Sequence, residues 1–249
     1  MDKIEELTGI LERLNSGEDP AKVKAEAKQL LSTIDPADLS IAEQHLVEKG
    51  LAPEDLRKLC TLHLELLEDQ SAKLKEKLPR EHVIATLINE HETILCFLDD
   101  LDFVNQSIQK MPGYKPEREE FRRLLHIAEQ LIGTELHHQR EEDILFPELE
   151  KRGVYGPPMV MKGEHAELRQ YKHKLLELAK TVSQMEFGDF RKQLDGVVRF
   201  IVPMLREHIF KENNILYPTA LEVIDNTEVW LRLKADCDRI GYCCFKPSG

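Results

Sequence analysis

Residues 135–150, ELHHQREEDILFPELE, contain the pattern that decides the fold. His137 and Glu141 stand four residues apart in an apolar helical pattern, and residues 207–220, EHIFKENNILYPTA, repeat the arrangement with His208 and Glu212. Aligned without gaps, the two stretches read H-x-x-x-E-x-x-I-L-[FY]-P. Because residues four apart lie on the same face of a helix, each stretch predicts a helix that presents a His and a Glu as a metal-ligand pair.

Single histidines precede each of these stretches. NEHETIL at residues 89–95 contains His91, and GEHAELR at residues 163–169 contains His165. His137 lies 46 residues after His91, and His208 lies 43 residues after His165, so each half of the region is a helix pair with the same order of ligands. The spacing therefore predicts an internally duplicated, pseudo-twofold arrangement.

Helix breakers divide the region into four long helical segments and predict an all-α fold. MPGYKP at 111–116 and RGVYGPP at 152–158 interrupt the helical pattern. Four long helices with short connections indicate an up-down-up-down four-helix bundle. The prolines inside these segments, Pro147, Pro203 and Pro218, are each expected to kink or end a helix locally. The expected segments are about 80–109, 116–151, 158–184 and 189–224.

The remaining parts of the chain predict smaller units. Residues 1–75 contain short helical stretches separated by turn residues, which indicates a small helical domain before a bundle at 80–224. Residues 225–249 begin as a short helix and then lose their pattern, so we expect a helix packed on the bundle, followed by a loose tail.

Charge and composition exclude several classes of protein. A net charge of -12 disfavours a nucleic-acid partner, because nucleic-acid affinity rests on clustered Lys and Arg. No apolar run reaches the roughly 18 residues of a membrane span, and the N-terminus lacks a signal-peptide pattern, so no membrane partner and a cytoplasmic location are expected. Five cysteines are an odd number, which disfavours a disulfide framework.

Four imidazoles and two carboxylates in one bundle core indicate a dinuclear metal site. This mixture of ligands favours iron or manganese over metals selected by thiolate. Each metal would take two His, both Glu would bridge, and positions would remain open for dioxygen, peroxide or nitric oxide. The predicted ligands are His91, His137, Glu141, His165, His208 and Glu212.

On these six residues and the two IL[FY]P tails, residues 80–224 resemble the hemerythrin-like HHE cation-binding family, in particular its di-iron subgroup associated with iron-sulfur cluster repair. The resemblance implies two iron ions with Glu bridges and an oxo or hydroxo bridge, with manganese or zinc as substitutes. Oxygen-carrying hemerythrins have a closely spaced His pair on the third helix, whereas Arg169 stands four residues after His165 here. Simple oxygen carriage is therefore disfavoured.

The sequence assigns no catalytic residue, and the plainest interpretation of the ligand set is a structural or storage site for a divalent cation, with no turnover. Two functional hypotheses go beyond it. The first is a non-haem di-iron protein that binds or reduces small oxidants such as nitric oxide, dioxygen or peroxide, with an electron-donor protein as partner, or that handles iron under stress. The alternative is a metal- or oxygen-dependent sensor or interaction protein without turnover.

Residues 1–75 also resemble a small helical domain of unknown function often found ahead of hemerythrin-like modules. The resemblance is carried by LNSGEDP at 14–20, EQHLVEKG at 43–50 and LCTLH at 59–63. It implies an architecture and no chemistry. Cys60 and His63 could form half of a metal site, but ordinary core packing is the favoured interpretation.

Several neighbouring residues have competing interpretations. His138 and Glu142 have the same spacing as His137 and Glu141, but counting ten residues back from each repeated proline selects His137 and His208. Glu90 and Glu164, just before the single histidines, are either surface carboxylates or, as a hypothesis, oxygen partners of a metal-bound imidazole. Core packing is favoured for Phe146, Tyr217 and His126, with a place along an access path as the alternative for His126. A structural or solvated role is favoured for His82 and His173, and a disordered tail for Cys243 and Cys244, which could otherwise be redox-active or bind a ligand.

Overall fold

A computed structural model describes residues 3–19, 36–50, 78–243 and 245, together with residues 22, 23, 26 and 30. Within these residues the secondary structure is entirely helical, which confirms the predicted fold class. No described helix is both long and apolar enough to cross a membrane. Cys60, His63 and Cys244 lie outside the described residues.

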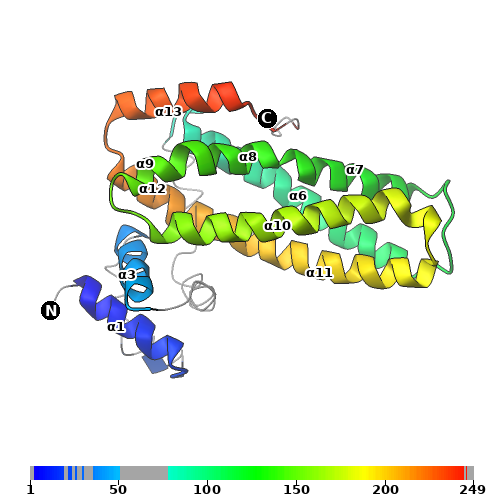
Figure 1. The fold of residues 1–249 in the computed structure, drawn as a ribbon, viewed down its shortest axis with the longest axis horizontal. Coiled ribbons are helices and arrows are strands. Elements are labelled where there is room, and N and C mark those ends of the chain that lie inside the picture. Colours follow the sequence, from blue (N-terminus) through cyan, green and yellow to red (C-terminus); the bar gives the residue numbers. More distant parts are fainter. Residues whose placement is uncertain are drawn as a thin grey trace.

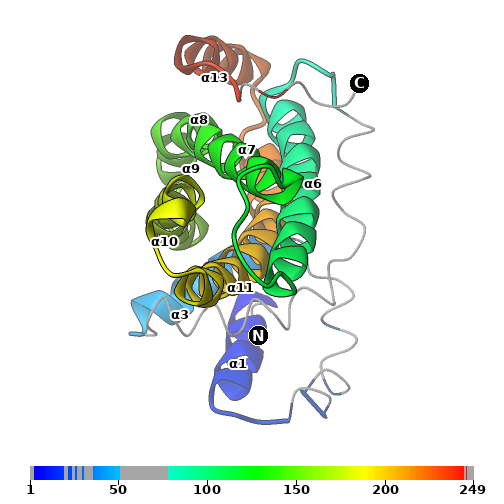
Figure 2. The ribbon, with the colours of Figure 1, turned by 90° about the vertical axis from the view of Figure 1, so that its right-hand side faces the viewer.

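Four antiparallel helical segments form the bundle (Figure 1). The first and third segments are single long helices, whereas the second and fourth are each interrupted by one π-helical turn. Viewed along the bundle, α6 lies beside α7 and α11, and α10 completes the ring between them (Figure 2). The helices are α6 (Val83–Gln109), α7 (Glu119–Gly133), α8 (Glu135–Arg140), α9 (Phe146–Glu150), α10 (Gly156–Thr181), α11 (Phe187–Lys211) and α12 (Tyr217–Val223).

Apolar residues at helical spacing explain the ring. In α7, Phe121, Leu124, Ala128 and Leu131 are buried, and they recur every three or four residues as one helical face requires. The second predicted segment is shorter than expected and breaks at Thr134. The Thr134 hydroxyl donates to the carbonyl of Leu131 at 2.7 Å, a side-chain bond that competes with regular helix.

The two π-turns, Glu141–Leu145 and Glu212–Leu216, each begin at a predicted Glu ligand. The residue after each turn donates its backbone N–H to the carbonyl of that Glu, five residues back. Pro147 and Pro218 follow directly, and a proline lacks the N–H that would continue the ordinary four-residue ladder. The predicted disruption at these prolines thus takes the form of a widened turn, whereas α11 continues through Pro203.

Two apolar clusters lie at opposite ends of the bundle, and the predicted ligands lie between them. Along α6, Ile88 belongs to one cluster and Ile94 to the other, with His91 in between. Along α10, Met161 and Leu168 flank the polar layer in the same way. The fold therefore shields the site from water on both sides.

Helices outside the ring cover one end of the bundle. α1 (Lys3–Asn15) packs on α3 (Pro36–Glu48), and α3 contacts α10, α12 and the second π-turn. α13 (Thr227–Ile240) packs on α6, α8 and the first π-turn. The side chain of Gln44 on α3 accepts a hydrogen bond from the backbone N–H of Tyr155 at 3.1 Å, beside Gly156 at the start of α10.

Candidate metal centre

The six predicted ligands meet in one buried layer of the bundle. The histidines come from four different helical segments, and each Glu is the first residue of a π-turn. Every one of the six side chains is almost fully inaccessible to solvent. The residues are His91, His137, Glu141, His165, His208 and Glu212.

In the first half of the site, the imidazoles of His91 and His137 point their Nε2 atoms at each other, 3.0 Å apart. Glu212 Oε2 lies 3.0 Å from His91 Nε2, and Glu141 Oε2 lies 3.5 Å from His137 Nε2. Each atom in this group is a type that binds first-row transition metals.

The second half repeats the arrangement with His165 and His208, whose Nε2 atoms are 2.9 Å apart. Glu212 Oε1 lies 2.8 Å from His208 Nε2, and Glu141 Oε2 lies 3.6 Å from His165 Nε2. Both carboxylates therefore lie between the two His pairs, where a bridge would have to lie.

Each ligand imidazole has a side-chain oxygen on its other nitrogen. Glu90 Oε2 is 2.8 Å from His137 Nδ1, and Glu164 Oε2 is 2.8 Å from His208 Nδ1. These contacts support the hypothesis that the two carboxylates orient imidazoles. Each carboxylate, however, contacts the histidine of the next helical segment and not the histidine beside it in the sequence. The other two oxygens, also at 2.8 Å, are Asn213 Oδ1 on His91 and Glu142 Oε1 on His165. Such contacts fix the tautomer that leaves Nε2 free for a metal.

Two buried cations are hydrogen-bonded to two of these carboxylates. Arg140, three residues after His137, is hydrogen-bonded to Glu90. Lys211, three residues after His208, is hydrogen-bonded to Glu164. Burial alone would raise the pKa of Glu90, but the hydrogen bond from His137 and the charge of Arg140 outweigh it and lower this pKa to about 2.

Three carboxylate oxygens in the layer, Glu141 Oε2 and both oxygens of Glu212, are buried without a hydrogen-bond donor in good geometry among the described residues. Burial and the neighbouring charge of Glu212 raise the pKa of Glu141 well above its usual range in the protein without metal. Buried carboxylate oxygens without donors are costly. The donor set therefore fits bound metal, with His91, His137, His165, His208, Glu141 and Glu212 as the residues that would hold it.

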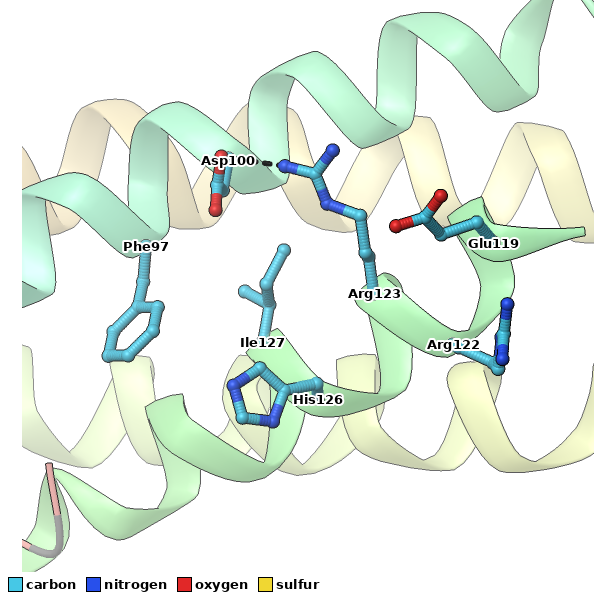
Figure 3. Close-up of a pocket in the computed structure, with 7 residues that line it drawn as sticks. All are labelled: Phe97, Asp100, Glu119, Arg122, Arg123, His126 and Ile127. Carbon is cyan, nitrogen blue, oxygen red and sulfur yellow. Dashed lines mark hydrogen bonds and ion pairs between the residues drawn. The ribbon is translucent and has the colours of Figure 1, made fainter.

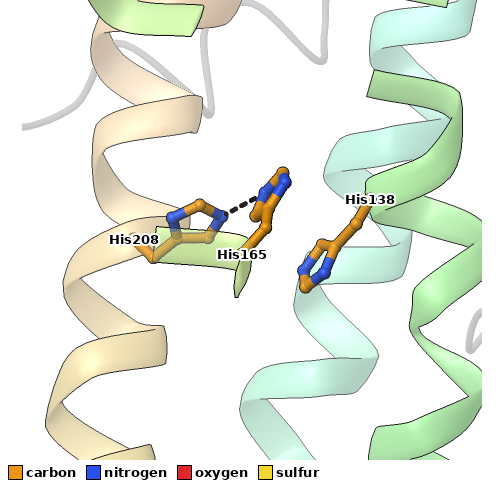
Figure 4. A group of neighbouring side chains, drawn as sticks. All are labelled: His138, His165 and His208. Atoms are coloured by element: carbon orange, nitrogen blue, oxygen red, sulfur yellow. Dashed lines mark hydrogen bonds between the residues drawn. The ribbon is translucent and has the colours of Figure 1, made fainter. Parts of the chain in front are cut away.

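His138 is closer to the site than its helical position indicated. Its ring stacks on that of His165 with centroids 3.9 Å apart, and a ligand atom of each lies near His208 (Figure 4). Its Nδ1 lies 3.6 Å from Glu135 Oε1 and has no hydrogen-bond partner in the described part of the chain. Burial lowers the pKa of His138 well below its usual value. The stacked ring forms a wall of the second half of the site.

Tyr217 was assigned to the core, and it is fully buried, but its hydroxyl reaches the ligands. It donates to Glu141 Oε1 at 2.8 Å. Tyr217 is five residues after Glu212, a spacing that points to different faces of an α-helix. The π-turn brings residues five apart onto one face. The repeated proline, which follows each π-turn, is the sequence signal from which this contact could have been predicted.

The histidines outside the layer have ordinary surroundings. His82 caps the start of α6 by accepting from the N–H of Ile84, and His173 is exposed, as expected. The core assignment of His126 was wrong. This side chain is exposed and lines a surface hollow with Phe97 and Arg123 on the outside of the bundle (Figure 3).

Residues 241–243, which follow α13, pack on the bundle instead of forming the predicted loose tail. Cys243 is buried, and its backbone N–H donates to Glu90 Oε1 at 3.2 Å. The guanidinium of Arg140 lies over the ring of Tyr242, 4.6 Å from its centroid. Burial raises the pKa of the Cys243 thiol to about 12. The residues after α13 thus contact the groups that orient His137.

A helical bundle with a duplicated set of His and Glu residues in its core is typical of cation-binding proteins. Comparisons with known proteins identify the family. The family described as the hemerythrin HHE cation binding domain matches residues 82–220, and a family of unknown function, DUF438, matches residues 7–73. The iron-sulfur cluster repair protein YtfE from Yersinia pseudotuberculosis serotype IB (strain PB1/+) is 30% identical to this chain over 163 residues. YtfE proteins from Yersinia pestis strains Pestoides F and bv. Antiqua Angola have the same identity over the same length. Each alignment covers 62% of this chain and 72% of the relative. The chain belongs to the hemerythrin HHE cation-binding family.

Proposed function

We propose that this chain is a non-haem di-iron protein of the iron stress response, which binds or reduces a small oxidant such as nitric oxide, dioxygen or peroxide. The observation that carries the proposal is a set of three buried carboxylate oxygens beside four imidazole Nε2 atoms, where no other described residue gives these oxygens a well-aligned donor. The names of the YtfE relatives support an assignment to iron-sulfur cluster repair.

Two iron ions in this layer would supply electrons and exchangeable positions for a small ligand. The chain's own residues orient the imidazoles through Glu90, Glu164, Glu142 and Asn213, and exclude water through the apolar clusters on either side.

Metal analysis and spectroscopy of anaerobically purified protein test the proposal. We expect about two iron per chain and a change in the optical and Mössbauer spectra when nitric oxide or oxygen is added to the reduced protein. Glu141→Ala should lower the iron content, because it removes a bridging oxygen. Protein that binds no iron, or bound iron that responds to neither ligand, would refute the assignment.

A sensor without turnover is the second candidate, because the N-terminal module touches the site's own scaffold. Helix α3 contacts the π-turn that begins at Glu212, and Leu46 of α3 is buried in the apolar cluster next to the ligands. A change at the metals could therefore alter the docking of α1 and α3. Limited proteolysis near residues 70–80 should then differ between metal-free, reduced and oxidised protein, and identical cleavage would exclude this role. Sustained consumption of an oxidant with an electron donor would favour the first candidate.

A further inference from the structure

The two halves of the metal layer differ at one position that faces the ligands. Aligned on H-x-x-x-E, the fifth residue after Glu141 is Phe146, and the fifth residue after Glu212 is Tyr217. Both side chains are fully buried, and both follow a π-turn. Tyr217 stacks on His91 with centroids 5.6 Å apart, and Phe146 stacks on His165 at 6.0 Å. The two halves therefore share this packing and differ by one hydroxyl group.

The extra hydroxyl contacts one half of the site only. Besides its 2.8 Å hydrogen bond to Glu141 Oε1, the Tyr217 oxygen lies 3.5 Å from His91 Nε2 and 3.4 Å from His137 Nε2. Phe146 offers the His165 and His208 pair no polar group at the equivalent position.

The hydrogen bond also makes the two carboxylates unequal. Glu212 directs Oε2 toward His91 and Oε1 toward His208, so it can serve each half with its own oxygen. In Glu141, Oε1 is held by Tyr217, and Oε2 alone lies between His137 and His165. The buried oxygens without donors agree with this count, since they include both oxygens of Glu212 and only Oε2 of Glu141.

We propose that Tyr217 is a positioning residue that makes the two metal positions inequivalent. Its single hydroxyl hydrogen, donated to Glu141 Oε1, leaves Glu141 one metal-facing oxygen, and the same hydrogen can turn to a small ligand at the His91 and His137 position alone. The inference rests on the proposed function. A small ligand that accepts a hydrogen bond takes this hydrogen over from Glu141 Oε1 and therefore binds at the His91 and His137 position, because the other position offers it only an apolar ring.

Azide is a suitable probe, because it is a small anion that accepts hydrogen bonds. Full-length Tyr217→Phe should retain about two iron per chain, since Phe occupies the equivalent position in the other half. Its azide affinity should fall about tenfold, the effect of losing one hydrogen bond to a charged group. Reduced wild-type protein should give two distinct Mössbauer doublets, and one of them should shift in the variant.

Tyr171→Phe is the matched control, because Tyr171 stacks on Phe200 at 3.7 Å in the other apolar cluster and removing its hydroxyl changes nothing near the ligands. It should leave azide affinity and both doublets unchanged.

The outcomes separate this inference from the proposed function. Wild-type protein without two iron per chain would overturn both. Full iron content with a single doublet in the wild type, or with unchanged azide affinity in Tyr217→Phe, would overturn the role of Tyr217 alone. A visible phenolate-to-iron band that disappears in Tyr217→Phe would also overturn it, because the oxygen would then be a ligand rather than a donor to Glu141.

Discussion

Replacing Glu164 by Gln tests two effects of this carboxylate: its effect on the metal affinity of His208 and its effect on the stability of the fold. Glu164 is fully buried, accepts from His208 Nδ1 at 2.8 Å and is also hydrogen-bonded to Lys211. Glu164→Gln keeps the size of the side chain and removes its charge. His208 then becomes a weaker metal ligand, and Lys211 loses its close carboxylate, while Glu207 Oε1 lies 3.5 Å from its Nζ.

The two consequences have different magnitudes. Loss of a carboxylate partner from a ligating imidazole lowers metal affinity about 10- to 100-fold, which corresponds to about 1.4 to 2.7 kcal/mol. A buried cation that loses its partner costs about 3 to 5 kcal/mol of stability. The metal-free protein should therefore be strongly destabilised while the metal-loaded protein still forms.

A double variant distinguishes the two effects. In Glu164→Gln/Lys211→Met the buried charge of Lys211 is gone together with its close carboxylate, so most of the free energy of unfolding in urea should return. The metal affinity should stay low, because His208 still lacks its carboxylate. Urea unfolding of the metal-free protein and competition with a chelator measure the two quantities.

An exposed ion pair provides the control. Asp99→Asn breaks the pair between Asp99 and Arg206 on the bundle surface, and such pairs contribute about 0 to 1 kcal/mol. It should change neither measurement appreciably. A metal affinity that falls less than threefold in Glu164→Gln, or that recovers in the double variant, would refute the reasoning.

Three further predictions test other parts of the molecule. The pKa of Glu90 is lowered from 4.5 to about 2. Ionised Glu90 therefore contributes about 3 kcal/mol to the stability of the metal-free protein above pH 4.5, and this contribution is lost as the pH falls toward 2. Urea unfolding across this range should show a smaller loss of stability in Glu90→Gln than in the wild type. Burial lowers the pKa of Lys172, so the folded state releases this proton at a lower pH than the unfolded state does. The free energy of unfolding should therefore rise as the pH approaches 10.5 from below. Unfolding measured at increasing alkaline pH should show no such rise in Lys172→Met. Leu46→Ala removes a buried contact between α3 and the bundle and should cost about 2 to 5 kcal/mol, which thermal unfolding and proteolysis of the N-terminal module would detect.

The bundle, and the single layer in which the six predicted ligands meet, were predictable because their signals are local in sequence. Helical spacing and the Pro and Gly breakers predicted four segments, and the repeated H-x-x-x-E with its downstream proline selected His137 over His138. The structure places the Nε2 atom of His137 3.0 Å from that of His91, whereas His138 stacks on His165.

The missed features depend on contacts between helices. The hydroxyl of Tyr217 reaches Glu141 across the bundle, and no spacing within one helix reveals such a contact. An α-helical spacing also places Tyr217 and Glu212 on different faces of the helix. The π-turn between them is what brings both side chains onto the same face. The order after α13 was missed for a similar reason, since Cys243 is held by Glu90, which is 153 residues away.

Charge explains why the duplicated layer should hold two cations in particular. Among the described residues, the layer buries the carboxylates Glu90, Glu141, Glu164 and Glu212, and the permanent cations paired with these four are Arg140 and Lys211. These cations pair with Glu90 and Glu164, so Glu141 and Glu212 have no permanent cation as a partner. Without metal, the protein compensates through protons: the pKa of Glu141 is raised, and the charge of Glu212 outweighs burial and raises the pKa of His208 to about 9. A divalent cation bound in each half, as proposed above, would replace these protons. Metal binding should therefore release protons, and the metal affinity should rise with pH through this range.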